Sequence, residues 1–128
     1  MNTYKTLYFI FLLAVLSSCG SGDELIQEQQ AQRINQLFSE IKDLSSSVKC
    51  NDASKWAYTS YGHKACGGPL GYIAYSTQID TVLFMQKIEE HRTLQEKFNE
   101  DWGIVSDCSL TQEPSGIKCE EKEAILIF

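Results

Sequence analysis

Two long stretches of the chain carry apolar residues at helical spacing. The first covers about residues 24–48, and its apolar residues recur every three or four positions, at Ile34, Leu37, Phe38, Ile41, Leu44 and Val48. The second covers about residues 78–99, with apolar residues at Ile79, Leu83, Phe84, Ile88, Leu94 and Phe98. Because an α-helix has 3.6 residues per turn, each set forms one stripe on a helix surface. The pattern therefore predicts two long amphipathic helices.

Shorter apolar segments have the composition of strands and turns. Residues 55–61 are rich in aromatic residues and end before a glycine, which predicts a strand. Residues 104–110, 117–119 and 124–128 are further strand candidates, whereas residues 70–75 favour one or two helical turns. The expected fold class is therefore α+β, with two long helices packed on a small β-sheet.

The N-terminal segment is apolar but too short to span a membrane. Residues 7–16 form an unbroken apolar run of ten residues, preceded by Lys5 and followed by two serines. A transmembrane helix needs roughly 20 apolar residues, so the run is typical of a signal segment that is removed on export. We expect residues 1–18 to be this segment and residues 25–128 to form a single α+β domain.

The residues Leu16-Ser17-Ser18-Cys19 resemble the lipobox of bacterial lipoproteins. The resemblance implies cleavage before Cys19 and a diacylglyceryl thioether on its sulfur, so that a lipid holds the protein on a membrane. Residues 19–24 then form the lipidated cysteine and a Gly/Ser-rich flexible tether. Gly20 directly after the lipidated cysteine favours, by the same resemblance, the outer membrane of the cell envelope, with a periplasmic or surface location. An ordinary signal peptide cut elsewhere, which would leave Cys19 as an odd thiol, is the alternative.

Four cysteines remain in the exported part of the chain: Cys50, Cys66, Cys108 and Cys119. An even number of cysteines in a small exported domain predicts two disulfides. A zinc site is the competing interpretation, but zinc-binding cysteines normally come as closely spaced pairs, which this chain lacks.

The predicted strands favour one connectivity. A strand at 55–61 would hold Cys50 and Cys66 about 20 Å apart, which disfavours a bond between them. A parallel strand at 104–110 and the hairpin after it would instead favour Cys66–Cys108 and Cys50–Cys119.

The charge balance restricts the classes of partner. The chain carries 11 Lys and Arg against 17 Asp and Glu, a formal net charge of −6. An acidic protein of this kind is a poor ligand for nucleic acid and for anionic lipid surfaces. We therefore expect no nucleic-acid partner; the charge suits a solvated surface or a basic protein.

Few residues are candidates for catalysis or metal binding. His63 and Cys66 are three positions apart and could hold a metal ion or pair a base with a nucleophile, but this needs a free thiolate and Cys66 is expected in a disulfide. His91 lies in the apolar stripe of the second helix, where a core histidine is expected. Three further carboxylates fit solvated charges: Glu100, Asp101 and Asp107. Because no catalytic, phosphate-binding, zinc or dinucleotide motif is present, we expect no enzymatic activity, no cofactor and no metal site.

Aromatic residues concentrate around one turn. Two glycines and a proline at residues 67–69 are flanked by Trp56, Tyr58, Tyr61, Tyr72 and Tyr75. Aromatic side chains with polar tips are favoured at recognition surfaces, which makes these residues binding candidates. Packing over the strand and helices as core residues is the alternative, and both roles can be divided among them.

The same part of the chain resembles a group of small secreted bacterial lipoproteins of uncharacterised function that share an Ala-Cys-Gly-Gly-Pro motif. The resemblance lies in Trp56 and in the segments 62–69, 71–76, 98–99 and 106–108. It implies an exported, disulfide-linked domain and brings no catalytic residue with it.

Together these features favour a lipid-anchored, non-enzymatic binding module that recognises an envelope or extracellular protein. Two alternatives remain open. One is an inhibitor or immunity lipoprotein that blocks an envelope-directed enzyme or toxin, and the other is a minor envelope hydrolase or redox enzyme.

Overall fold

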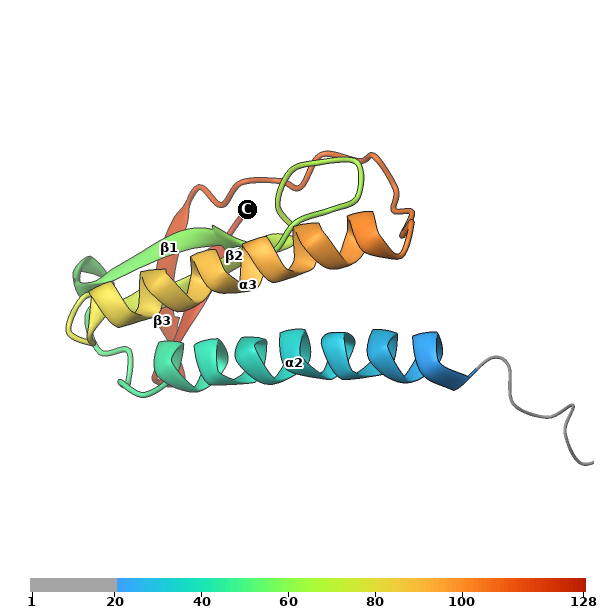
Figure 1. Ribbon diagram of the computed structural model, residues 1–128. Helices are drawn as coiled ribbons and strands as arrows, with labels where there is room; N and C mark the ends of the chain where they lie inside the picture. Colours follow the sequence, from blue (N-terminus) through green and yellow to red (C-terminus); the bar gives the residue numbers. More distant parts are fainter. Residues whose placement is uncertain (1–20) are drawn as a thin grey trace, which may run out of the picture.

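The computed structural model describes residues 21–128, so the signal segment and Cys19 lie outside the described residues. Two long helices and two β-hairpins form the described part, together with the short 3-10 helix η1 (Figure 1). In chain order the elements are α2 (Ser21–Ser45), η1 (Ala53–Lys55), β1 (Trp56–Tyr61), β2 (Gly71–Ser76), α3 (Thr81–Asp101), β3 (Gly116–Glu120) and β4 (Glu123–Ile127). The α+β class is confirmed, but the strands form two separate two-stranded antiparallel sheets rather than one sheet.

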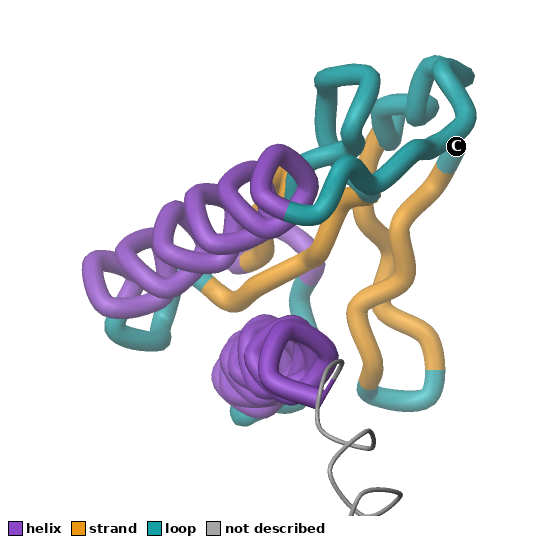
Figure 2. The backbone as a smooth tube through the Cα atoms, turned by 45° about the vertical axis from the view of Figure 1, so that its right-hand side comes forward, coloured by secondary structure: helices purple, strands orange, loops and turns teal. Residues whose placement is uncertain are grey.

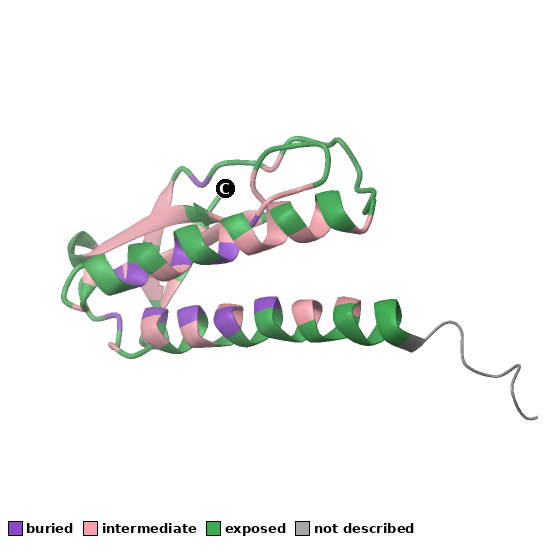
Figure 3. Cartoon of the chain, in the orientation of Figure 1, coloured by how far each residue is buried: buried purple, intermediate pink, exposed green. Residues whose placement is uncertain are grey.

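The two helices build the core between their facing stripes. Leu37 and Ile41 of α2 are fully buried, as is Phe84 of α3, and Ile88 completes the cluster. Figure 3 shows the buried positions on the sides of α2 and α3 that face each other. Both helices were predicted from their apolar stripes and are confirmed, with boundaries shifted by about three residues. No helix within residues 21–128 is both long enough and apolar enough to cross a membrane.

The start of α2 differs from the expected flexible tether. The helix begins at Ser21, so residues 21–24 form its first turn instead of a coil. Asp23 and Glu24 lie in this turn, where negative charge interacts favourably with the positive end of the helix dipole.

The segment 70–75 was predicted to form helical turns, and this prediction is wrong. Residues 71–76 form β2, which pairs antiparallel with β1 in the register Tyr61↔Gly71 to Trp56↔Ser76. A short apolar run fits a helix turn and a strand equally well by periodicity. Here the neighbouring strand β1 decides, because it supplies hydrogen-bond partners along the whole segment.

Gly71 is required where the two strands meet near their turn. The ring of Tyr61 lies against Gly71, and a Cβ atom added at Gly71 would come within 2.9 Å of the Tyr61 hydroxyl oxygen. The same ring stacks on Phe38 of α2, with ring centroids 4.6 Å apart. Gly71 therefore lets Tyr61 connect the hairpin to the helix.

The strand candidates at 117–119 and 124–128 are confirmed as β3 and β4, and the two strands pair as a second hairpin. Glu121 and Lys122 make its two-residue turn, with φ angles of 49° and 68°. Positive φ at both central residues is the geometry of a type I′ turn, which matches the natural twist of paired strands. The hairpin leaves one edge of β4 without a strand partner among residues 21–128.

The predicted strand at 104–110 is absent; these residues form an irregular segment. Its apolar side chains are exposed: Val105 is 90% and Leu110 98% accessible. Ile104 and Val105 are β-branched and favour a strand. Within residues 21–128, however, no strand pairs with this segment through backbone hydrogen bonds.

The cysteines form the two pairs that the sequence favoured. Cys50 and Cys119 have Cα atoms 5.3 Å apart, and Cys66 and Cys108 5.4 Å. The route by which Cys108 returns differs from the prediction, because the irregular segment and not a parallel strand carries it back. Each bond closes a loop of 42 residues or more, worth about 4 kcal/mol in the chain-entropy account.

Candidate functional site

A groove of about 910 Å³ lies between the C-terminal half of α2, strand β2 and strand β4. Figure 2 shows the two hairpins as separate pairs of strands that diverge toward α2. Phe38 and Lys42 line the groove from α2, residues 72–74 from β2, and residues 121–126 together with Phe128 from the C-terminal hairpin. The groove is therefore built by segments from both ends of the described chain.

Three of the five aromatic binding candidates line this groove: Trp56, Tyr61 and Tyr72. All three are half-buried, so each presents part of its ring to solvent. Such partly exposed rings on a rigid hairpin can bury further apolar area when a ligand binds. The structure thus brings most of the predicted recognition residues to one hollow.

The other two candidates have different neighbours. Tyr75 stacks on the buried Phe84, with ring centroids 4.7 Å apart, and so packs against the core. Tyr58 packs edge-on against Tyr72 at 6.0 Å, on the face of the hairpin away from Tyr75, and is not part of the groove lining. The aromatic cluster is therefore divided between core packing and the groove.

Unpaired lysines gather at the groove. Of the ten Lys and Arg side chains in residues 21–128, six form ion pairs with carboxylates. The remaining four form no such pair within the described chain, and three of them, Lys42, Lys49 and Lys122, line the groove. Glu121 and Glu123 also line it, so the lining carries three positive and two negative charges on a chain with net charge −6.

The three lysines belong to segments at one end of the groove: Lys42 lies in the last turn of α2, Lys49 follows this helix, and Lys122 lies in the β3–β4 turn. The backbone N–H of Cys50 donates to the carbonyl oxygen of Lys122 at 2.8 Å, which holds Lys49 and Lys122 on adjacent segments. Lys42 lies over the ring of Phe38, with its Nζ 5.3 Å from the ring centroid. This grouping could not be predicted from the sequence, because the three lysines come from three separate segments.

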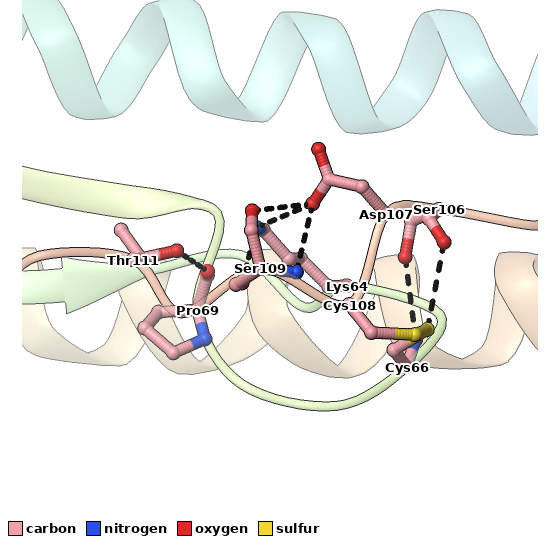
Figure 4. Close-up of polar contacts among 8 residues, drawn as sticks. All are labelled: Lys64, Cys66, Pro69, Ser106, Asp107, Cys108, Ser109 and Thr111. Atoms are coloured by element: carbon pink, nitrogen blue, oxygen red, sulfur yellow. Dashed lines mark hydrogen bonds and ion pairs between the residues drawn. A yellow bond between two sulfur atoms is a disulfide. The ribbon is translucent and has the colours of Figure 1, made fainter.

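A second polar cluster joins the loop between β1 and β2 to the segment after α3 (Figure 4). The Lys64 ammonium donates to Asp107 Oδ1 at 3.1 Å and to the Ser109 carbonyl oxygen at 3.0 Å. Beside it, the backbone N–H of Cys66 donates to Ser106 Oγ at 3.3 Å, next to the Cys66–Cys108 disulfide. These contacts fix the irregular segment after α3 to the glycine-rich turn.

The geometry of this cluster suits a structural role better than nucleophilic catalysis. Ser109 Oγ lies 3.3 Å from Lys64 Nζ, but its hydroxyl donates to Asp107 Oδ1 at 2.7 Å. The Lys64 ammonium is engaged by Asp107 Oδ1 and the Ser109 carbonyl oxygen together, so its hydrogen bonds hold the two loops in place. Hydrogen bonds from Ser109 and Lys64 lower the pKa of Asp107 below its ordinary value, so this carboxylate is a weak base.

His63 is held by its backbone in the loop after β1. Its N–H donates to Gln95 Oε1 at 3.2 Å, and its carbonyl oxygen accepts from Asn99 Nδ2 at 2.9 Å. The candidate partner Cys66 is in a disulfide and so offers no thiolate. Within residues 21–128, no group of three His, Cys, Asp or Glu side chains is arranged to hold a metal ion.

His91 is buried in the core, with only 3% of its surface exposed. It lies beside the stacked rings of Phe38 and Tyr61, at centroid distances of 5.2 and 6.3 Å. Burial lowers the pKa of His91, since the charged imidazolium loses its hydration there. Its Nδ1 has no hydrogen-bond partner within residues 21–128, and the ring behaves as a neutral core group in contact with two side chains that border the groove.

The three carboxylates considered in the sequence do not form a common site. Asp101 pairs with Lys97 at 2.8 Å on the surface of α3, and Asp107 pairs with Lys64 in the loop cluster. Glu100 is exposed on the helix. Their separate environments offer no paired acid and base.

No protein-family model matches the chain, and comparison with curated proteins and with solved structures found no match.

Proposed function

We propose that this protein is a lipid-anchored, non-enzymatic binding module of the bacterial cell envelope, and that it holds its partner in the groove between α2, β2 and β4. The observation that carries the proposal is the groove itself, where Trp56, Tyr61 and Tyr72 meet on a disulfide-linked scaffold. The lipid anchor on Cys19 is proposed from the lipobox resemblance, and places the groove outside the cytosol.

The chemistry of the lining supports binding over turnover. Aromatic and aliphatic side chains supply apolar area, and three lysines supply positive charge at one end. A volume of about 910 Å³ lies in the range of sites that bury drug-sized ligands, roughly 300–1,000 Å³. The lining of this groove includes no histidine and no cysteine that could act as base or nucleophile.

Site-directed crosslinking in intact cells tests the proposal. A photoreactive phenylalanine analogue is placed at Ala74 inside the groove, and at Val82 on α3 as control. Val82 is apolar, 68% exposed and outside the groove lining. The proposal expects one defined crosslinked protein from position 74 and none from position 82.

Substitution of an aromatic residue in the groove lining provides a second test within the same crosslinking experiment. Trp56→Ala should reduce the crosslink from position 74 at least tenfold, because aromatic residues at the centre of a binding site carry much of its affinity. Tyr58→Ala serves as the matched control, since Tyr58 belongs to the same hairpin but not to the groove lining. Equal crosslinking from positions 74 and 82, or no effect of Trp56→Ala in a folded protein, would refute the groove as the binding site.

A further inference from the structure

We propose that the partner binds as an extended strand that adds to the open edge of β4, and that it carries at least one carboxylate near its end at Lys42, Lys49 and Lys122. This inference rests on the proposed function, since it names how the same groove holds its partner. It goes beyond that function by assigning backbone groups of β4 as the main contact.

The groove meets β4 at its edge rather than on one of its faces. Successive residues of a strand point to opposite faces, so a hollow on one face would be lined by every second residue only. Ala124, Ile125 and Leu126 all line the groove. Residues 72–74 of β2 line it in the same consecutive way, so both open edges border the hollow.

The hairpin geometry identifies which backbone groups of β4 are available. A two-residue type I′ turn is flanked by a pair of residues that exchange both backbone hydrogen bonds, here Glu120 and Glu123. Hydrogen-bonded and non-hydrogen-bonded pairs alternate along an antiparallel pair of strands. The backbone N–H and C=O groups of Glu123, Ile125 and Ile127 therefore point toward β3. In agreement, the Ile127 carbonyl oxygen accepts from the Ser115 N–H at 2.6 Å.

The N–H and C=O groups of Ala124 and Leu126 therefore point away from β3, into the groove. No strand among residues 21–128 pairs with this edge. The outer side of β4 has the features of an unprotected edge: an apolar sequence, Ala-Ile-Leu-Ile, without proline, lysine or a bulge. Such an edge is a template for a further strand.

The spacing of the two hairpins favours β4 alone, and not both edges, as the partner of the added strand. On β2, the N–H of Thr77 donates to the Lys55 carbonyl oxygen at 2.9 Å, so Tyr72 and Ala74 present their outward backbone groups to the groove. A strand paired with both edges needs about 9.6 Å between them, twice the ordinary spacing. Where Cα atoms of β2 and β4 approach within 8 Å, no strand fits between them, so the added strand pairs with β4 toward the β3–β4 turn, where the two hairpins diverge (Figure 2). Only β2 residues 72–74 border the groove, whereas almost all of β4 does.

The side chains around the groove specify the chemistry of the partner. An added strand would turn every second side chain toward Phe38 and Tyr61, which stack on each other, so apolar residues are expected at alternate positions. The end of the strand near the β3–β4 turn would meet the three unpaired lysines, which favours Asp or Glu there.

Selection from a displayed library of random dodecapeptides against the full chain in mild detergent provides the probe. We expect selected peptides to carry apolar residues at every second position and an excess of Asp and Glu toward one end. The best peptide is then synthesised and titrated against the protein. On binding, the amide proton of Leu126 should exchange with solvent at least tenfold more slowly, whereas that of Ile125, already bonded to β3, should change little.

Two substitutions on one cross-strand pair provide matched variants. Leu126 and Ile117 lie directly opposite each other, and each directs its N–H away from the hairpin. Leu126→Pro should weaken peptide binding at least tenfold, while Ile117→Pro, on the opposite edge, should leave it within twofold. If Leu126→Pro fails to fold, an ester in place of the amide at position 126 removes the same N–H with little change in shape, and should weaken binding about two- to tenfold.

Two lysine substitutions test whether the partner carries a carboxylate. Lys122→Gln should weaken binding severalfold. Lys55→Gln should not, since Lys55 also lacks an ion pair but lies outside the groove lining. Enrichment of basic or neutral peptides would overturn the expected carboxylate.

The outcomes separate the two proposals. Peptides that lose affinity with Trp56→Ala but neither slow the exchange of Leu126 nor respond to the ester would overturn strand addition and leave the groove function intact. Failure to select any groove-dependent peptide, together with a negative crosslink from position 74, would overturn both. A dimer in sedimentation that Leu126→Pro dissociates would show that the edge of β4 binds a second copy, which also overturns the inference.

Discussion

At the scale of single residues, one glycine supports the wall of the groove. Gly71 is the position where the ring of Tyr61 passes over β2 to stack on Phe38. A methyl group there would collide with the ring within 2.9 Å. The residue thus connects local backbone geometry to the placement of a groove side chain.

Gly71→Ala should therefore lower the free energy of unfolding by about 1–3 kcal/mol, because the ring must leave its packed position. Gly116→Ala is the control in a denaturant titration. Gly116 is also a strand glycine, but its added Cβ would have no neighbour closer than 4.0 Å. A Gly71→Ala protein as stable as wild type would contradict the packing described for Tyr61.

Buried His91 makes a pH-dependent contribution to stability. Its pKa is lowered in the folded protein, whereas the unfolded chain titrates near the ordinary value of 6.5. As the pH falls below 6.5, the unfolded state takes up a proton that the folded state resists, so the free energy of unfolding decreases. Above pH 6.5 both states are neutral at this residue and the effect vanishes.

Denaturant titrations between pH 7.5 and 5 should show this decrease, and His91→Leu should remove most of it. His63→Gln is the control, because it removes the other histidine of the chain, whose Nε2 lies 3.9 Å from Glu96 Oε1, and keeps both backbone hydrogen bonds of residue 63. The carboxylates with lowered pKa, such as Asp107, start from ordinary values of 4.5 or less and act below this window. An unchanged slope in His91→Leu would show that the ring is not the source.

At the scale of elements, α3 depends on a side-chain cap at its first turn. Asp80 precedes the helix and its Oδ1 accepts from the Leu83 N–H at 2.9 Å. Asp80→Ala should cost about 1 kcal/mol of stability. Asp80→Asn keeps the acceptor and should lose much less. Equal losses in both variants would indicate that the charge, and not the hydrogen bond, is responsible.

The long elements could be predicted from the sequence, and the short ones only in part. The stripes of α2 and α3 each repeat over several turns, so periodicity is decisive there. Residues 71–76 and 104–110 are short apolar runs whose state is set by whether a strand lies beside them. β2 has β1 as a neighbour and is a strand, whereas residues 104–110 have none and are held by Lys64 and the Cys66–Cys108 bond.

The candidate site shows the same division. The aromatic density around the glycine-rich turn predicted three residues of the groove: Trp56, Tyr61 and Tyr72. The lysines and the edge of β4 could not be predicted, because they depend on how the C-terminal hairpin lies against α2. That placement follows from Cys50–Cys119, which joins the end of α2 to β3.

At the scale of the whole molecule, the two disulfides have different roles. Cys50–Cys119 fastens the hairpin that forms one side of the groove, and Cys50 is 2% exposed. Cys66–Cys108 joins two exposed loops away from the groove lining. The first bond therefore stabilises the shape of the groove, and the second mainly stabilises the loop structure.

Double Cys→Ser variants should separate these roles. Removing Cys50–Cys119 should abolish peptide binding even under conditions where α2 and α3 keep their helical circular dichroism. Removing Cys66–Cys108 should leave binding within twofold and increase proteolysis within residues 104–110. The reverse pattern would place the binding surface on the loop cluster instead.

The most direct test of the central claim is a calorimetric titration of the selected dodecapeptide with wild type, Trp56→Ala and Val82→Ala. The groove account predicts that Trp56→Ala raises the dissociation constant about 30-fold or more, which corresponds to loss of roughly 2 kcal/mol at a binding hot spot, while Val82→Ala binds as wild type does. A folded Trp56→Ala protein with unchanged affinity would contradict the account.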